Sequence, residues 1–219
     1  MKVTQAVEAV ASARAVLFDL DGVLVDSSAV IDRVWREWAV HHDVAWGTVE
    51  PLLPGRRASE TVGLLAPYLD SAAEGAELER VQAADIAGIR ACRGSVALTE
   101  ELSSRALPWA IVTSGSRPTA TTRLRAMGFR VPEVLVTADD VANGKPDPEG
   151  YLAAARRLGV PTGDCLVVED AEVGVRAARA AGARVAGITG PGLGGAAKAV
   201  DLLIGAVGDL LGLVGRGGE

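Results

Sequence analysis

The 219-residue sequence has few aromatic residues, 4% of the chain, and two cysteines. Cys92 and Cys165 lie far apart and form no CxxC pair, so they do not make a disulfide framework in a chain of this size. We therefore expect a reducing, cytoplasmic environment. The apolar residues, 49% of the chain, are mostly Ala, Val and Leu. This composition suits helices packed closely on a parallel sheet.

Positive charge and long apolar runs are also scarce. Lys and Arg number 22 against 28 Asp and Glu, which gives a net charge of −6, and no basic stripe indicates nucleic-acid binding. The first sixteen residues carry Glu8 and Arg14 and no sustained apolar stretch, so we expect no signal peptide. The apolar segment 196–215 contains Lys198, Asp201 and Asp209 and is too polar to span a bilayer. We expect neither nucleic acid nor a membrane as partner.

From about residue 105, short apolar runs alternate with helical patterns. Strands are predicted at 109–114, 133–137, 165–170, 184–189 and 201–207. The helices between them close at Gly128, Gly159 and Gly182. This alternation, with glycine at helix ends, predicts an α/β fold with a doubly wound parallel sheet, a Rossmann-like core.

The first predicted strand, "AVLFDL" at 15–20, is too far from the next one, at 109, for a single crossover helix. Within 28–43, Val30, Val34 and Trp38 recur at helical spacing, and further helical stretches are predicted at 60–69 and 77–92. We therefore expect a helical insertion, residues 28–93, in a core made of residues 1–27 and 94–219.

Polar residues gather where the predicted strands end, which is where ligands of an open parallel sheet bind. These residues are Asp19 and Asp21 after the first strand, Thr113, Ser114 and Gly115 after the second, Glu169 and Asp170 after a later strand, and Lys145 just before a helix.

Their chemistry points to phosphoryl transfer. Clustered carboxylates suit a hard cation, and Mg²⁺ prefers one or two carboxylates together with water and phosphate oxygens. A hydroxyl and N–H groups at a strand-to-helix turn suit an anion, as does a lysine. Carboxylates also serve as nucleophiles that form aspartyl-phosphate. The cation and the phosphate would offset the cost of placing acids beside an apolar strand.

Four motifs carry a family resemblance. "DLDG", "VTSG", "GKPDP" and "VVED" occur in this order, each after the expected element. Each is weak alone, but together they resemble the haloacid dehalogenase (HAD) superfamily from Val16 to Ile204. With "GRRASETV" in the insertion, the chain is similar to the small sugar-phosphate and polyol-phosphate phosphatases related to β-phosphoglucomutase. Those proteins carry a helical cap after the first strand, which implies that residues 28–93 form a cap domain.

The resemblance implies roles for four acids. Asp19 would be the nucleophile, and Asp21 the general acid that protonates the leaving alcohol and then the base that activates water. Mg²⁺ would be held by Asp19, Asp170 and the backbone carbonyl of Asp21, with Glu169 helping directly or through water.

The resemblance also implies the phosphate and substrate contacts. Ser114 and the N–H of Gly115 would hold the phosphoryl oxygens, and Lys145 would offset the charge of the nucleophile and the phosphate. The cap loop would read the leaving group through Arg56 or Arg57, and the sequence does not show which one points inward.

Two departures separate this chain from the mutases. The mutase-like pattern has a histidine near position 31 and an arginine at position 58, where this chain has Ile31 and Ala58. Both favour a Mg²⁺-dependent phosphatase for a small sugar or polyol phosphate, with an aspartyl-phosphate intermediate. The alternatives are a phosphomutase, a phosphoglycolate-type phosphatase or a non-catalytic regulator that binds a phosphate ligand. We expect a monomer whose partner is a small phosphorylated metabolite.

Overall fold

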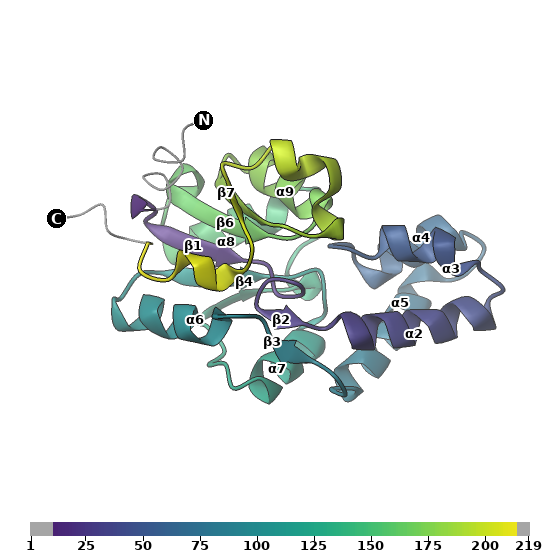
Figure 1. The fold of residues 1–219 in the computed structure, drawn as a ribbon. Helices are drawn as coiled ribbons and strands as arrows, with labels where there is room; N and C mark the ends of the chain where they lie inside the picture. Colours follow the sequence, from purple (N-terminus) through teal and green to yellow (C-terminus); the bar gives the residue numbers. More distant parts are fainter. Residues whose placement is uncertain (1–10, 214–219) are drawn as a thin grey trace.

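A six-stranded parallel sheet forms the centre of the α/β core (Figure 1). The computed structural model describes residues 11–213, so residues 1–10 and 214–219 of the predicted core lie outside it. The strand order is β5-β4-β1-β6-β7-β8. The strands are β1 (Ala15–Phe18), β4 (Trp109–Val112), β5 (Val134–Val136), β6 (Cys165–Glu169), β7 (Arg184–Ile188) and β8 (Leu202–Ile204). The predicted α/β fold with a doubly wound parallel sheet is confirmed.

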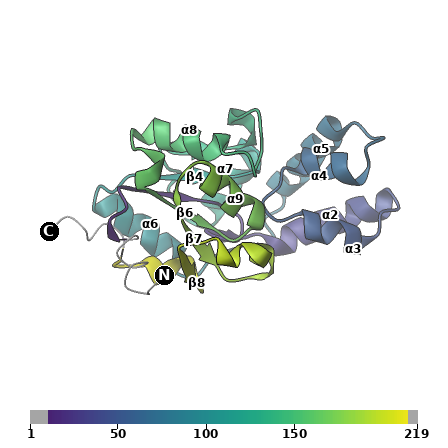
Figure 2. The same ribbon diagram turned by 90° about the horizontal axis from the view of Figure 1, so that it is seen from above.

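Helices cover both faces of the sheet (Figure 2). In β1, Ala15 and Leu17 pack toward α8 (Glu149–Leu158) and α9 (Glu172–Ala180). Val16 and Phe18 pack toward α6 (Ser95–Ser104) and α7 (Arg117–Ala126). All four side chains are fully buried. Burial on both faces explains why the strands appear in the sequence as continuous apolar runs.

Short elements complete the core. Gly128, Gly159 and Gly182 follow α7, α8 and α9 at positive φ, as predicted. The 3-10 helices are η2 (Ala138–Asp140), η3 (Thr162–Asp164), η4 (Pro191–Lys198) and η5 (Val207–Leu210). The strand predicted at 201–207 therefore ends at Ile204, and η5 begins three residues later.

Between residues 11 and 213, no helix combines the length and apolar character that crossing a bilayer requires.

The insertion extends to one side of the sheet (Figure 1). It contains α2 (Ser28–His41), α3 (Trp46–Val49), η1 (Glu50–Leu52), α4 (Ala58–Leu65) and α5 (Ser71–Ala84). A two-stranded antiparallel ribbon, β2 (Val25–Asp26) with β3 (Arg90–Ala91), joins it to the core.

The helix predicted at 77–92 has different bounds in the structure. It is α5, which begins at Ser71 because the Asp70 side chain caps it by accepting from the N–H groups of the next two alanines. It ends at Ala84, where the Asp85 carboxylate accepts from the Ala87 N–H and starts a turn. Arg90 and Ala91, near the end of the predicted helix, form β3 instead.

Candidate active site

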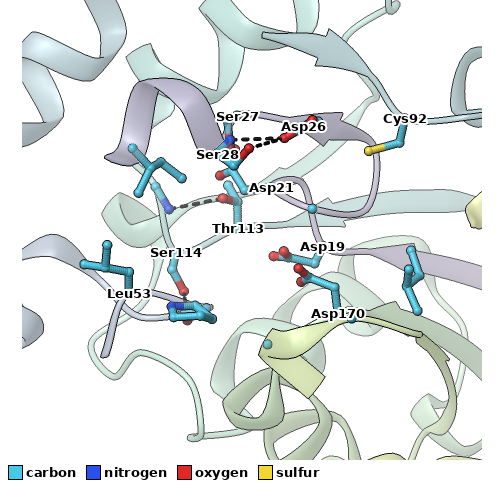
Figure 3. Close-up of a pocket in the computed structure, with 18 of the residues that line it drawn as sticks. Asp19, Asp21, Asp26, Ser27, Ser28, Leu53, Cys92, Thr113, Ser114 and Asp170 are labelled. Atoms are coloured by element: carbon cyan, nitrogen blue, oxygen red, sulfur yellow. Dashed lines mark hydrogen bonds between the residues drawn. The ribbon is translucent and has the colours of Figure 1, made fainter. Parts of the chain in front are cut away.

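A cavity of about 800 Å³ lies between the carboxyl ends of the strands and the insertion. Of the predicted residues, those that line it are Asp19, Asp21, Arg56, Thr113, Ser114, Gly115 and Asp170, and those that do not are Arg57, Lys145 and Glu169. The carboxylates of Asp19 and Asp170 face each other in Figure 3. The strands end at one edge of the sheet, so separate segments of the chain meet here.

Lys145 and Glu169 lie buried beside Asp19. Lys145 Nζ donates to Asp19 Oδ1 at 2.5 Å and to Glu169 Oε1 at 2.7 Å. Glu169 Oε1 also accepts from the Tyr151 hydroxyl at 2.5 Å. Burial would lower the pKa of Lys145, but the charges of Asp19 and Glu169 outweigh it and raise that pKa above its ordinary value. The lysine therefore stays positively charged against the predicted nucleophile.

The acids form a cluster suited to a divalent cation. Asp19, Glu169 and Asp170 each offer an oxygen, and these oxygens all lie within 4.8 Å of one another. Burial, followed by the charge of Glu169, raises the pKa of Asp170 to about 7. Burial also raises the pKa of Asp19, although the charge of Lys145 opposes the change. One lysine thus compensates the buried acids incompletely, and a hard cation with oxygen ligands fits the remaining charge.

Asp21 is held in place by two donors. The Ser27 hydroxyl and Arg123 Nη1 both donate to its Oδ1, each at 2.6 Å. Arg123 is 2% exposed, and its Nη2 donates to Gln82 Oε1 on α5 at 3.0 Å. Sequence reasoning missed this arginine. The signal was its helical spacing from Ala120, which indicates the inward face of α7.

The two predicted phosphate-binding groups of the strand-to-helix turn, Ser114 and Gly115, both have protein partners. The Ser114 hydroxyl donates to the Gly55 carbonyl in the insertion at 2.7 Å. The Gly115 N–H donates to Thr113 Oγ1 at 3.1 Å. A phosphate bound by these two groups would replace or share those hydrogen bonds.

The two candidate arginines differ in position. Arg56 lines the large cavity. The guanidinium of Arg57 instead donates to the carbonyls of Val141 and Ala142 at 2.9 and 3.0 Å, and it lies beside Glu60. Arg57 therefore ties the insertion to a core loop, and Arg56 is the arginine placed to meet a ligand.

Comparison with known proteins identifies the family. The family model of haloacid dehalogenase-like hydrolases matches residues 13–182. The chain belongs to the haloacid dehalogenase-like hydrolases. It is 41% identical over 191 residues to hexitol phosphatase A of Escherichia coli (strain K12), covering 86% of this chain and 88% of that protein. It is 35% identical over 184 residues to validoxylamine A 7'-phosphate phosphatase of Streptomyces hygroscopicus subsp. limoneus, covering 79% and 84%.

Solved structures agree with this HAD assignment. A hydrolase from Pseudomonas syringae superposes with a TM-score of 0.76 at 31% identity, covering 91% of this chain and 96% of that one. A mutant of CbbY from Rhodobacter sphaeroides, in complex with xylulose-(1,5)bisphosphate, superposes with a TM-score of 0.77 at 25% identity, covering 90% of this chain and 96% of that one. The HAD family implies a divalent metal, and the cluster of Asp19, Glu169 and Asp170 is where one fits.

Proposed function

We propose that this HAD hydrolase is a Mg²⁺-dependent phosphatase that cleaves a small sugar or polyol phosphate through an aspartyl-phosphate on Asp19. It is an enzyme, a phosphoric monoester hydrolase. One observation carries the mechanism: a buried lysine holds Asp19 beside further acids at the edge of a cavity large enough for a small metabolite. Hexitol phosphatase A, 41% identical, supports the substrate class.

The reaction needs two displacements at phosphorus. Lys145 binds one carboxylate oxygen of Asp19, and we assign the attack to the other. The ester P–O bond breaks as Asp21 gives its proton to the leaving oxygen. Asp21 then takes a proton from water, whose oxygen attacks phosphorus and releases phosphate and the Asp19 carboxylate. Mg²⁺ held by Asp19, Asp170 and the Asp21 carbonyl, with Glu169 nearby, would supply positive charge against the phosphoryl oxygens.

Residues 28–93 act as the cap in this proposal. Helices α2, α4 and α5 contribute residues that line the cavity, and β2 and β3 carry the two connections to the core. Ile31 and Ala58 both line the cavity. Where the mutase-like pattern has a histidine and an arginine, this cavity has apolar side chains, which supports hydrolysis over phosphate relocation.

Ser114, Gly115 and Lys145 receive the phosphate. The cytoplasmic location and the monomeric state stay predictions.

Phosphate release tests the function. Hexitol, hexose and glycerol phosphates and phosphoglycolate are incubated with the protein in Mg²⁺ and in EDTA. We expect metal-dependent release that favours the sugar or polyol esters and disappears in Asp19→Asn. Asp164→Asn is the matched control, because Asp164 lies at the opposite end of β6 and pairs with the exposed Arg14. Release that survives in a folded Asp19→Asn variant would exclude Asp19 as the nucleophile.

A further inference from the structure

Glu79 faces the active-site cavity, although no motif in the sequence indicates it. It belongs to α5 in the insertion, and its side chain crosses to the core helix α7. Its Oε2 accepts from the Ser116 N–H at 2.9 Å and from the Thr119 hydroxyl at 2.7 Å. A Cβ atom built on Gly115 would lie 3.9 Å from the same oxygen. The carboxylate therefore stands beside the predicted phosphate-binding turn.

The start of α7 is already filled by protein groups. The first N–H groups of a helix ordinarily suit anions such as phosphate. Here the Ser116 N–H bonds to Glu79, and the Arg117 N–H bonds to Asp139 at 2.8 Å. The next residue is a proline, and the Thr119 N–H bonds to the Ser116 hydroxyl at 3.4 Å. Two of these occupants are carboxylates, and one of them, Glu79, lines the cavity, so its charge repels a further anion there.

The charge of Glu79 has no partner of opposite sign within the described range. No lysine or arginine of residues 11–213 forms an ion pair with it. The two arginines of α7 that bond to acids, Arg117 and Arg123, pair with Asp140 and Asp21 respectively. Its Oε1 accepts no hydrogen bond from the described residues. A substrate hydroxyl could donate to that oxygen, whereas a phosphate dianion or an ionised carboxylate could not.

The ligands named for two similar proteins differ in the charge that they carry besides one phosphate group. One is a hexitol phosphatase, and a hexitol phosphate has an uncharged polyol as its leaving group. Another is seen in complex with a bisphosphate, which carries a second dianion. We propose that Glu79 is a specificity-determining residue that selects a neutral polyhydroxyl leaving group and excludes substrates with a second anionic group. This inference rests on the proposed phosphatase function.

Substrate ratios test the proposal. We would measure kcat/KM for a hexitol 6-phosphate and for a hexose 1,6-bisphosphate in the full-length protein with Mg²⁺. The unchanged protein should have the higher kcat/KM for the monophosphate. Glu79→Gln removes the charge of the side chain but keeps its shape, so it should raise the ratio of kcat/KM for the bisphosphate to kcat/KM for the monophosphate by about tenfold or more. Glu77→Gln is the matched control. Glu77 lies on the same helix, but its exposed side chain pairs with Arg80, so the ratio should stay constant.

Salt provides a second measurement that needs no variant. Because repulsion between charges is screened by ions, the ratio in the unchanged protein should rise with ionic strength, and it should rise less in Glu79→Gln. A ratio that neither the variant nor salt changes would overturn the proposal and leave Glu79 as a docking contact between α5 and α7. If Glu79→Gln does not fold, the same kcat/KM ratio measured in Glu79→Ala, and its dependence on salt in the unchanged protein, test the proposal in its place. If the unchanged protein releases no phosphate from either substrate, the proposed function has failed instead.

Discussion

Gly22, the last residue of the "DLDG" motif, allows the acids of the site to approach one another. Its φ is +83°, and a Cβ atom there would lie 2.0 Å from Asp170 Oδ2. An L side chain would thus meet both backbone strain and a collision with a predicted metal ligand. The glycine is required by the contact between two distant segments of the chain, in addition to the turn itself.

We expect Gly22→Ala to weaken Mg²⁺ binding as well as the fold. Gly128→Ala is a matched control, because Gly128 has a similar φ of +78° with no atom within 4 Å of a built Cβ. The control should lose about 1–2 kcal/mol of unfolding free energy from backbone strain alone. Gly22→Ala should lose more and should need a higher Mg²⁺ concentration for half-maximal activity. Urea unfolding and metal titration would measure both, and equal losses with unchanged metal dependence would contradict the prediction.

The sequence reveals some of these residues and conceals others. Asp19 and Asp170 could be predicted to meet, because parallel strands bring their carboxyl ends to one edge. Arg123 could be placed on the inward face of α7 by its helical spacing, but neither its contact with Asp21 nor the position of Glu79 could be predicted. Each sits within a helix, and only the packing of α5 against α7 directs it into the cavity.

Helix α7 links the phosphate-binding turn to the predicted acid and base. It begins just after Gly115, and its buried Arg123 reaches Asp21. An arginine fixes a carboxylate in direction as well as charge. Gln82 of α5 holds the other terminal nitrogen of the guanidinium, so the two helices together orient Asp21. Arg123 is therefore a positioning residue in our proposal.

We expect Arg123→Met to slow proton transfer to the leaving group. It should lower kcat/KM for a hexitol phosphate by about 100-fold, in the range of general-acid effects. It should lower kcat/KM for p-nitrophenyl phosphate much less, because nitrophenolate leaves without a proton. Arg125→Met is the control, because Arg125 lies on the same helix and is exposed. Equal losses on both substrates would indicate a structural role only.

Some helices and strands could be predicted from the sequence, and others could not. Terminal glycines indicated the ends of α7, α8 and α9, and periodicity supported α8 and α9, which are amphipathic on the sheet. The inward face of α7 is partly polar, since Thr119 and Arg123 are buried there. The start of α5 was missed, since its first turns are polar and depend on the Asp70 cap. The ribbon of β2 and β3 was missed as well, because two residues per strand leave no alternation to detect.

At the scale of the whole molecule, one apolar core runs from the sheet into the insertion. Phe18 and Val168 of the sheet belong to the same buried cluster as Val30, Val34 and Trp35 of α2. The active-site cavity lies beside this continuous packing. The insertion therefore has no separate core of its own in this arrangement, and its stability should depend on the sheet.

This continuity predicts that Mg²⁺ bound at the sheet also stabilises the insertion. In a Trp109→Phe variant, the remaining fluorescence comes from Trp35, Trp38 and Trp46, all in the insertion. Its urea transition should coincide with that of circular dichroism. Mg²⁺ at 100 times its dissociation constant should raise the unfolding free energy by about 2.7 kcal/mol in both signals. Adding Asp170→Asn should abolish that shift. A fluorescence transition at lower urea that ignores Mg²⁺ would instead mean that the insertion unfolds independently of the sheet.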